Sequence, residues 1–153
     1  MSATDDAPRT AGGSKAAAIS NLTVRLLSQY TGRGPTKART FLNDDMVTVV
    51  LQDTLTKAEI TLVGTGHHET VLSTRKTFQD VMGPDLIAGV EKVTGRTVVA
   101  FLSANHVDPD VAVESFLLAP LDNGGGNHAA SGNHDASGNG DAADNADGTG
   151  PTG

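Results

Sequence analysis

The last stretch of the chain sets the strongest limit on its fold, because it holds almost nothing that a core could bury. From Asp122 to Gly153 the 153-residue sequence has no Val, Ile, Leu, Met or aromatic residue, and Gly, Asn, Ala, Asp and Ser dominate. Such a segment cannot offset the conformational entropy that folding costs. We therefore predict a disordered tail over residues 122–153 and, from similar composition, a disordered N-terminus over residues 1–14. One domain, residues 15–121, remains for the fold.

Charge is concentrated in the predicted tail rather than in the predicted domain. The chain has a net charge of −7, of which the aspartates of residues 122–153 supply −5. The first 15 residues are balanced, so the rest of the chain carries only −2. Nucleic-acid binding depends on many cations that neutralise phosphates. A nearly neutral domain with an acidic tail therefore argues against a nucleic-acid partner, while the tail favours solubility.

The sequence contains no cysteine, which excludes disulfides, thiolate catalysis and cysteine-ligated metals. Its apolar runs reach only about five residues, as in Val98–Leu102, whereas a membrane-spanning helix needs roughly 20. The acidic N-terminus lacks the apolar run of a secretory signal. We expect a cytoplasmic protein without a span of its own, whose membrane role would be peripheral, at the inner face of the cell membrane, or through a partner.

Hydrophobic spacing and turn residues predict the element order α-β-β-α-α-α-β-β. Gly32 is expected to end the first helix in a left-handed conformation, and Thr56 with Glu59 matches a capping box. Gly83-Pro84 predicts a break between the last two helices. Two hairpins with helices between them predict an α+β fold, in which helices cover one face of an antiparallel sheet. The helices are expected at residues 16–31, 56–63, 69–82 and 85–94, and the strands at 38–42, 46–52, 96–103 and 112–119.

The loop GRGPTKAR, residues 32–39, gathers glycines, a proline and cations. A phosphate-binding P-loop would need G-x-x-x-x-G-K-[ST] between a strand and a helix, and both the spacing and the element order differ here. A less specific anion site for phosphate or carboxylate stays open, with Gly34 turning backbone N–H groups toward the ligand and Arg33, Lys37 and Arg39 supplying charge. The alternative is a helix end followed by a tight turn with solvated cations, which favour that terminus.

A second polar loop, SANHVDPD, places Asn105, His106, Asp108 and Asp110 close together. Its spacing matches neither an EF-hand nor a zinc signature, so we predict no metal site. The alternatives are a structural hairpin, a partner contact, or a proton relay in which His106 titrates near neutral pH. An enzyme that uses His106 with Asp108 or Asp110 is a further option. No nucleophile elbow or comparable constellation is present, so we expect neither catalysis nor a cofactor.

Three blocks of the sequence occur in the order expected of one family of small bacterial proteins. They are ISNLTVRLLSQYTGRGPTKART, VVLQDTLTKAEITLV and GVEKVTGRTVVAFLSANHVDPDVAVESFLL. Over residues 19–118 the chain resembles the MpsC-like family, formerly a domain of unknown function and named as the C component of a sodium-translocating, membrane-potential-generating system. The resemblance implies an association with cation movement and with membrane protein subunits. It brings no catalytic residues to this chain.

The resemblance and the missing span together predict an accessory or regulatory component that acts by protein–protein contact with membrane subunits of a cation-translocating system. The alternative is a cytoplasmic domain that binds an anion. Homodimer formation also stays open, for example through strand 112–119 if that strand lay at an exposed sheet edge.

Overall fold

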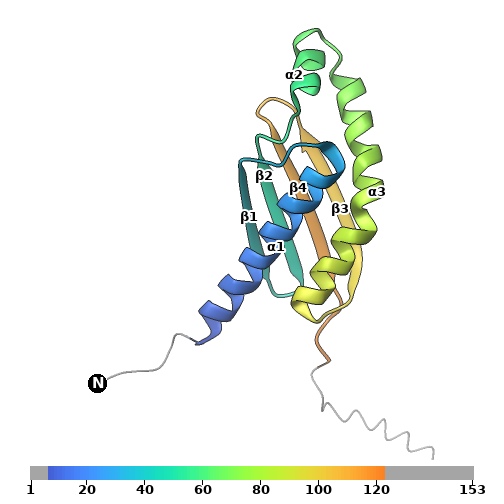
Figure 1. The fold of residues 1–153 in the computed structure, drawn as a ribbon. Helices are drawn as coiled ribbons and strands as arrows, with labels where there is room; N and C mark the ends of the chain where they lie inside the picture. Colours follow the sequence, from blue (N-terminus) through green and yellow to red (C-terminus); the bar gives the residue numbers. More distant parts are fainter. Residues whose placement is uncertain (1–6, 123–153) are drawn as a thin grey trace, which may run out of the picture. The chain divides into compact units, whose positions relative to one another are not determined.

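A computed structural model describes residues 7–122 of the chain, with side chains from Gly12 onward. Of the predicted disordered segments, residues 1–6 and 123–153 lie outside the described residues, whereas residues 7–14 are helical. The α+β class and the antiparallel sheet covered by helices are confirmed (Figure 1). The elements are α1 (Ala7–Thr31), β1 (Lys37–Asn43), β2 (Met46–Gln52), α2 (Lys57–Gly64), α3 (His68–Thr94), β3 (Val98–His106) and β4 (Val111–Leu118).

The four strands form one antiparallel sheet in the order β1-β2-β4-β3. The hairpins β1–β2 and β3–β4 are joined by pairing of β2 with β4, so that Phe116 lies beside Val47 on one side and Phe101 on the other. The expectation that strand 112–119 could be an exposed edge is therefore wrong. Partners on both sides satisfy the backbone of β4, and the edges of the sheet are β1 and β3.

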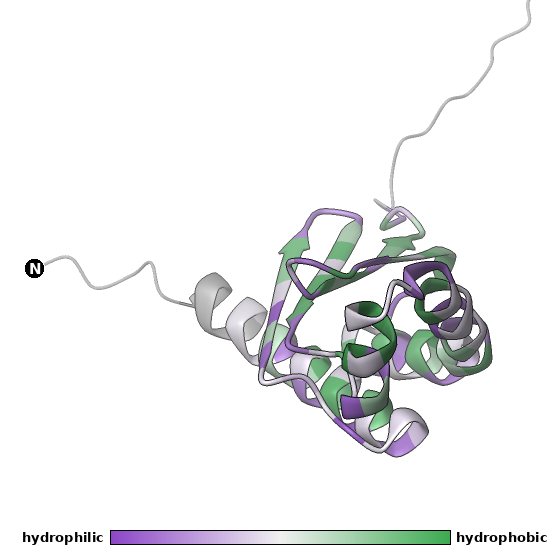
Figure 2. Cartoon of the chain, turned by 90° about the horizontal axis from the view of Figure 1, so that it is seen from above, coloured by the Kyte–Doolittle hydropathy of each residue, from purple (hydrophilic) through white to green (hydrophobic). Residues whose placement is uncertain are grey.

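Both long helices lie on the same face of the sheet (Figure 2). Helix α1 packs mainly against β1, α3 packs against β3, and the two helices contact each other. The core between the helices and the sheet contains the stacked rings of Phe101 and Phe116, whose centroids are 5.0 Å apart. Its fully buried apolar residues include Ile19, Val47, Val49, Val90 and Phe116.

Helix α1 begins at Ala7, well before the predicted start at Ala16. Pro8 does not prevent this, because the first turn of a helix has no partner for its N–H groups and the proline lacks one. At the other end the prediction is confirmed, since Gly32 adopts a φ of 79° and its N–H donates to the Ser28 carbonyl at 2.9 Å.

Helix α3 runs without interruption through Pro84, so the predicted break at Gly83-Pro84 does not occur. A proline inside a helix removes one backbone hydrogen bond and crowds the preceding turn. Here burial holds both halves in place, because Met82 and Leu86 pack into the core on either side of the proline. The ring of Phe101 also lies against Gly83, while Pro84 itself is exposed.

Replacing Pro84 with alanine should therefore stabilise the fold, because the helix regains a hydrogen-bond donor without any change in the core. We expect the free energy of unfolding to rise by about 1–3 kcal/mol, the helix-interior difference between the two residues less the added entropy of the unfolded chain. Urea unfolding followed by circular dichroism measures it, with Thr77→Ala on the same helix as the control. A Pro84→Ala protein less stable than the parent would contradict this account of α3.

Candidate functional site

The main set of buried polar side chains in the described chain is centred on Arg75 of α3. Arg75 is only 7% exposed. We call Thr54, Glu59, Arg75, Asn105 and Asp110 the Arg75 cluster. Its members come from the β2–α2 loop, α2, α3, β3 and the β3–β4 turn. The cluster therefore ties together segments that are far apart in the sequence.

Every nitrogen of the Arg75 guanidinium donates a hydrogen bond. Nε and Nη2 bind the two carboxylate oxygens of Glu59 at 3.1 and 3.0 Å. Nη1 binds Thr54 Oγ1 at 2.8 Å and Asn105 Oδ1 at 3.2 Å, and Nη2 also binds the Thr54 carbonyl at 2.7 Å. The fork of donors fits the carboxylate in two-point fashion, which gives the pair a defined geometry. Arg75 is thus saturated by protein atoms.

Glu59 has a second function, because it is also the N3 residue of α2. Its Oε2 accepts from the Thr56 N–H at 2.7 Å, and the Thr56 hydroxyl accepts from the Glu59 N–H at 3.3 Å. This reciprocal arrangement is the predicted capping box. The side chain that caps α2 therefore also anchors it to α3, although α2 itself has no buried residue.

The structure divides the four residues singled out in the second polar loop into two pairs. Asn105 and Asp110 turn inward: Asp110 accepts from the Thr54 hydroxyl at 2.7 Å and from the Leu55 N–H at 2.8 Å. Asp108 and His106 are exposed, and His106 Nδ1 pairs with the Pro109 carbonyl oxygen at 2.8 Å within the same turn. The partner-contact and proton-relay roles of His106 stay predictions.

The four residues of the predicted anion site do not converge on one point. Arg33 donates to the Leu55 carbonyl, while Gly34 lies against α1, where an added Cβ would be 2.4 Å from Ser28 Oγ. Lys37 and Arg39 lie on β1 and line a surface hollow of about 490 Å³, and the Arg39 guanidinium lies 5.0 Å from the centre of the Phe41 ring. An anion held by all four would require Arg33 to leave Leu55.

The two marked loops nevertheless meet through a shared segment. The carbonyl of Leu55 accepts a hydrogen bond from Arg33, and its N–H donates one to Asp110. Both loops are therefore hydrogen-bonded to the same residue. Asp53 makes a similar link, because its N–H donates to the Asp110 carbonyl at 3.3 Å and its carboxylate accepts from Thr36. The loops therefore fix the β2–α2 connection.

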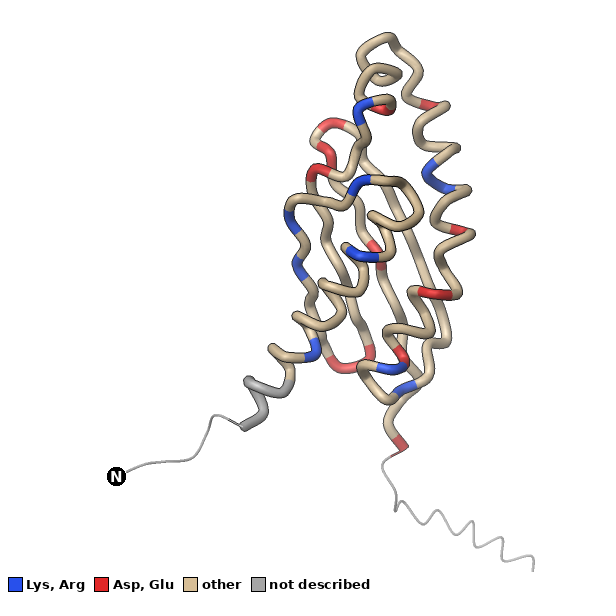
Figure 3. Tube along the Cα trace, viewed as in Figure 1, with Lys and Arg blue, Asp and Glu red and all other residues tan. Residues whose placement is uncertain are grey.

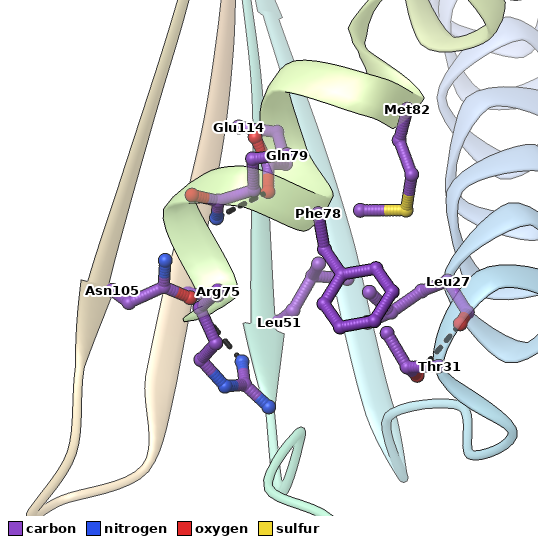
Figure 4. A pocket seen from close by; sticks show the side chains of 10 residues that line it. Leu27, Thr31, Leu51, Arg75, Phe78, Gln79, Met82, Asn105 and Glu114 are labelled. Carbon is purple, nitrogen blue, oxygen red and sulfur yellow. Dashed lines mark hydrogen bonds between the residues drawn. The ribbon is translucent and has the colours of Figure 1, made fainter. Parts of the chain in front are cut away.

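Glu114 of β4 is a carboxyl group placed inside the core at 1% exposure. Its Oε1 accepts from the Gln79 side-chain amide at 3.2 Å, as Figure 4 shows, while Oε2 has no hydrogen-bond partner. The hydroxyl of Ser103, its cross-strand neighbour, is also buried without a partner. Burial raises the pKa of Glu114 to about 7, and the hydrogen bond from Gln79 and the charge of Arg75 only partly oppose this.

The enclosed space between Arg75 and Glu114 is small, whereas an open surface hollow of about 300 Å³ adjoins Gln79, Ser103 and Asn105. A cavity of about 10 Å³, lined by Arg75, Gln79 and Glu114 among others, has room for about one water molecule. Within residues 7–122, no group of three or more His, Asp, Glu or Cys side chains could hold a metal ion. The hydrogen bonds of the Arg75 cluster therefore hold the β2–α2 loop, α2, α3 and β3 together.

The second candidate site is the face of the sheet opposite the helices. Alternate residues of each strand point away from the core, as the burial pattern of β2 and β4 indicates. Charged residues are sparse along the strands (Figure 3), and on this face they are Lys37 and Arg39 of β1. We call this surface the open sheet face, and its apolar members are Phe41, Met46, Val50, Ala100, Leu102, Ala104, Val111, Val113 and Leu117.

Comparison with known proteins identifies the family. Residues 11–120 match the model of the family described as "Na+-translocating membrane potential-generating system (MpsC)". The chain belongs to the MpsC family. No curated protein and no solved structure matches it at a significant level. Among the described helices of this MpsC-family protein, none is both long and apolar enough to cross a membrane.

Sequence reasoning missed Arg75, Gln79 and Glu114, which form the buried polar contacts. All three are polar residues, which are usually exposed. For Glu114 one signal was available, because it lies in register with the apolar positions Ala112 and Phe116 of a strand that alternates inward and outward.

Removing Arg75 should be strongly destabilising, because it leaves the carboxylate of Glu59 without its partner. We expect Arg75→Met to lower the free energy of unfolding by about 3–5 kcal/mol, and the double variant with Glu59→Gln to recover part of the loss. Chemical denaturation of the four proteins of this cycle measures the coupling.

Lys76→Met is the matched control, since the Lys76–Asp80 pair on the same helix is largely exposed and should contribute little. If Arg75→Met and Lys76→Met lowered the free energy of unfolding equally, the Arg75 cluster would not be what stabilises the fold.

Glu114 should make stability fall as the pH rises. Its pKa is about 7 in the folded chain against an ordinary 4.5, so between these values the folded state binds a proton that the unfolded state does not. This contribution is fully present below pH 4.5 and is lost as the pH rises to about 7, which amounts to about 3 kcal/mol. Glu114→Gln cannot ionise, so it should remove this slope and be more stable than the parent at pH 8.

The measurement is the difference in free energy of unfolding between the Glu114→Gln and parent proteins from about pH 5 to 8, which cancels titrations common to both. Glu91→Gln on α3 serves as the control for a carboxyl-to-amide change. A difference that stays constant over this range would mean that Glu114 is ionised in the folded core.

Proposed function

We propose that this MpsC-family protein, none of whose described helices could cross a membrane, works by protein–protein contact in a sodium-translocating, membrane-potential-generating system. The family description names the sodium-translocating system in which the protein would act. The open sheet face supplies the contact surface, and it is the observation that carries the proposal.

The open sheet face has the composition and size of an interaction surface. Strands spaced about 4.8 Å apart, with about seven residues rising 3.3 Å each, give the sheet a projected area of roughly 400 Å². Contiguous apolar patches of this size on a monomer usually mark binding sites. Leu102 illustrates the point, because it lies near the middle of β3 and is 58% exposed.

The hydrogen bonds of Arg75 support a structural role for this residue over a catalytic one. Its donors are all bonded to protein atoms, and the cavity beside it holds about one water molecule. Arg75 would have to give up these bonds to reach a substrate. The anion-binding alternative has less support, because Arg33 is bonded to Leu55 and does not line the hollow beside Lys37 and Arg39.

A charge placed on the open sheet face should release the protein from its partners. We expect tagged parent protein to be recovered with the membrane fraction of native cells, and Leu102→Glu to reduce that recovery at least tenfold, because a buried unpaired carboxylate is costly. Quantitative immunoblotting of fractions after ultracentrifugation measures it.

Val81→Glu is the matched control, since Val81 is 56% exposed but lies on α3, on the helical side. Thermal unfolding of both variants checks that each is folded. If Leu102→Glu were recovered with membranes as fully as the parent, or if the parent never associated with membranes, the proposed function would fail.

A further inference from the structure

We infer that the open sheet face is covered by a second copy of this chain, in a twofold dimer whose sheets pack face to face with the helices outside. The inference rests on the proposed function in one respect, namely that this face is a protein contact surface. It names a second copy as the occupant, so the loss of membrane recovery expected of Leu102→Glu would follow from loss of the dimer. Four features of the chain support it: the lack of an internal cover, the register of the face, its charge pattern and its area.

The chain itself has no segment suited to cover this face. The helices occupy the other side of the sheet (Figure 2), and α2 contacts α3. The parts of the chain outside the described residues, 1–6 and 123–153, contain no Val, Ile, Leu or aromatic residue. Burying an apolar surface requires apolar partners, so an external surface of matching character is needed.

The register of the strands makes the face complementary to itself. Cross-strand partners define rows that run across the sheet, and one central row is Phe41, Thr48, Ser115 and Leu102. A twofold axis parallel to the strands, between β2 and β4, would bring each β1 residue over the β3 residue of the same row in the second copy. Phe41 of each chain would then meet Leu102 of the other.

The same axis gives further favourable pairs. Val50 would face Val113, and Met46 would face Leu117, since each pair shares a row of the sheet. The small polar side chains of Thr48 and Ser115 lie at the centre of the face, where they leave room for the large Phe41 and Leu102 side chains from the flanks. Two twisted sheets of identical shape can pack in this aligned manner, about 10 Å apart.

The charge pattern is compatible with this arrangement. The cations of the face, Lys37 and Arg39, both lie on the edge strand β1. The proposed axis carries β1 of one chain over β3 of the other, so Arg39 would meet Ala104 and Lys37 would meet His106. Lys37 and Arg39 therefore do not face each other, and the single acidic residue of the four strands, Glu114, lies on the core side.

The size of the face predicts a reversible dimer. The two projected areas of roughly 400 Å² sum to about 800 Å². Protruding side chains make the accessible area that is buried larger than this, which brings it closer to the lower limit of about 1,200 Å² for stable interfaces. We therefore expect association that depends on concentration, with a dissociation constant in the micromolar range, near 1–100 µM by order of magnitude.

Analytical ultracentrifugation of the 153-residue protein from about 1 to 500 µM tests the inference, since this range brackets such a constant. The parent should shift from its monomer mass of 15.6 kDa to twice that mass, Leu102→Glu should stay monomeric throughout, and Val81→Glu should behave as the parent. A parent that is monomeric at every concentration, or a dimer that Leu102→Glu leaves intact, would overturn the inference.

Cross-linking locates the contact independently of stability. The chain contains no cysteine, so a single introduced thiol reports its own surroundings. Ser115→Cys, close to the proposed axis, should give a covalent dimer with a short bismaleimide, whereas Thr77→Cys on the exposed side of α3 should not. Equal cross-linking of both, or cross-linking of Thr77→Cys alone, would contradict a dimer formed through the open sheet face.

The two proposals can fail separately. A monomeric parent whose Leu102→Glu variant still loses membrane recovery would reject the second copy as occupant and leave the proposed function intact. A dimer formed through Leu102 in a protein that never associates with membranes would support the inference and reject the proposed function.

Discussion

The interaction on which the rest of the structure depends is the pairing of Arg75 with Glu59 and Thr54. The guanidinium joins α3 to the β2–α2 loop and, through Asn105, to β3. Glu59 carries the same restraint into α2 as its capping residue. Because α2 buries no residue of its own, this network rather than hydrophobic packing sets its position. The loops that carry Arg33 and Asp110 complete the support by bonding to Leu55.

The one-sided placement of the helices explains why the sheet carries a contact surface. In an antiparallel sheet with one solvated face, the outward residues are usually polar. Here the outward positions of β2, β3 and β4 instead include Val50, Leu102 and Val113, while the inward positions form the core. Both faces thus have apolar character, yet the chain supplies a cover for one of them. Within residues 7–122 the helices cover one face of the sheet and leave the other face exposed.

Local signals in the sequence predicted the elements well, because spacing and caps act over a few residues. Gly32 ended α1, and Thr56 with Glu59 began α2, as expected. Effects that depend on tertiary packing were not predictable in this way. Pro84 stays within a helix because core contacts on both sides outweigh its local cost, and β4 became a central strand through its pairing with β2. The marked loops were correctly noticed, but only the structure gives Arg33 and Asp110 their common partner.

The two faces of β4 separate stability from recognition. Glu114 points into the core, whereas its neighbours Val113 and Ser115 lie on the open sheet face. A partner that binds only the folded chain adds stability by mass action, whatever it contacts. Because that partner leaves the surroundings of Glu114 unchanged, it should raise stability without changing the contribution of Glu114 to the pH dependence. A ligand that entered the core beside Gln79 and Glu114 would alter that contribution, since the charge of the carboxyl would respond to it directly. The pH dependence of the free energy of unfolding thus responds to changes on the covered face of the sheet. Its dependence on protein concentration responds to binding at the open sheet face.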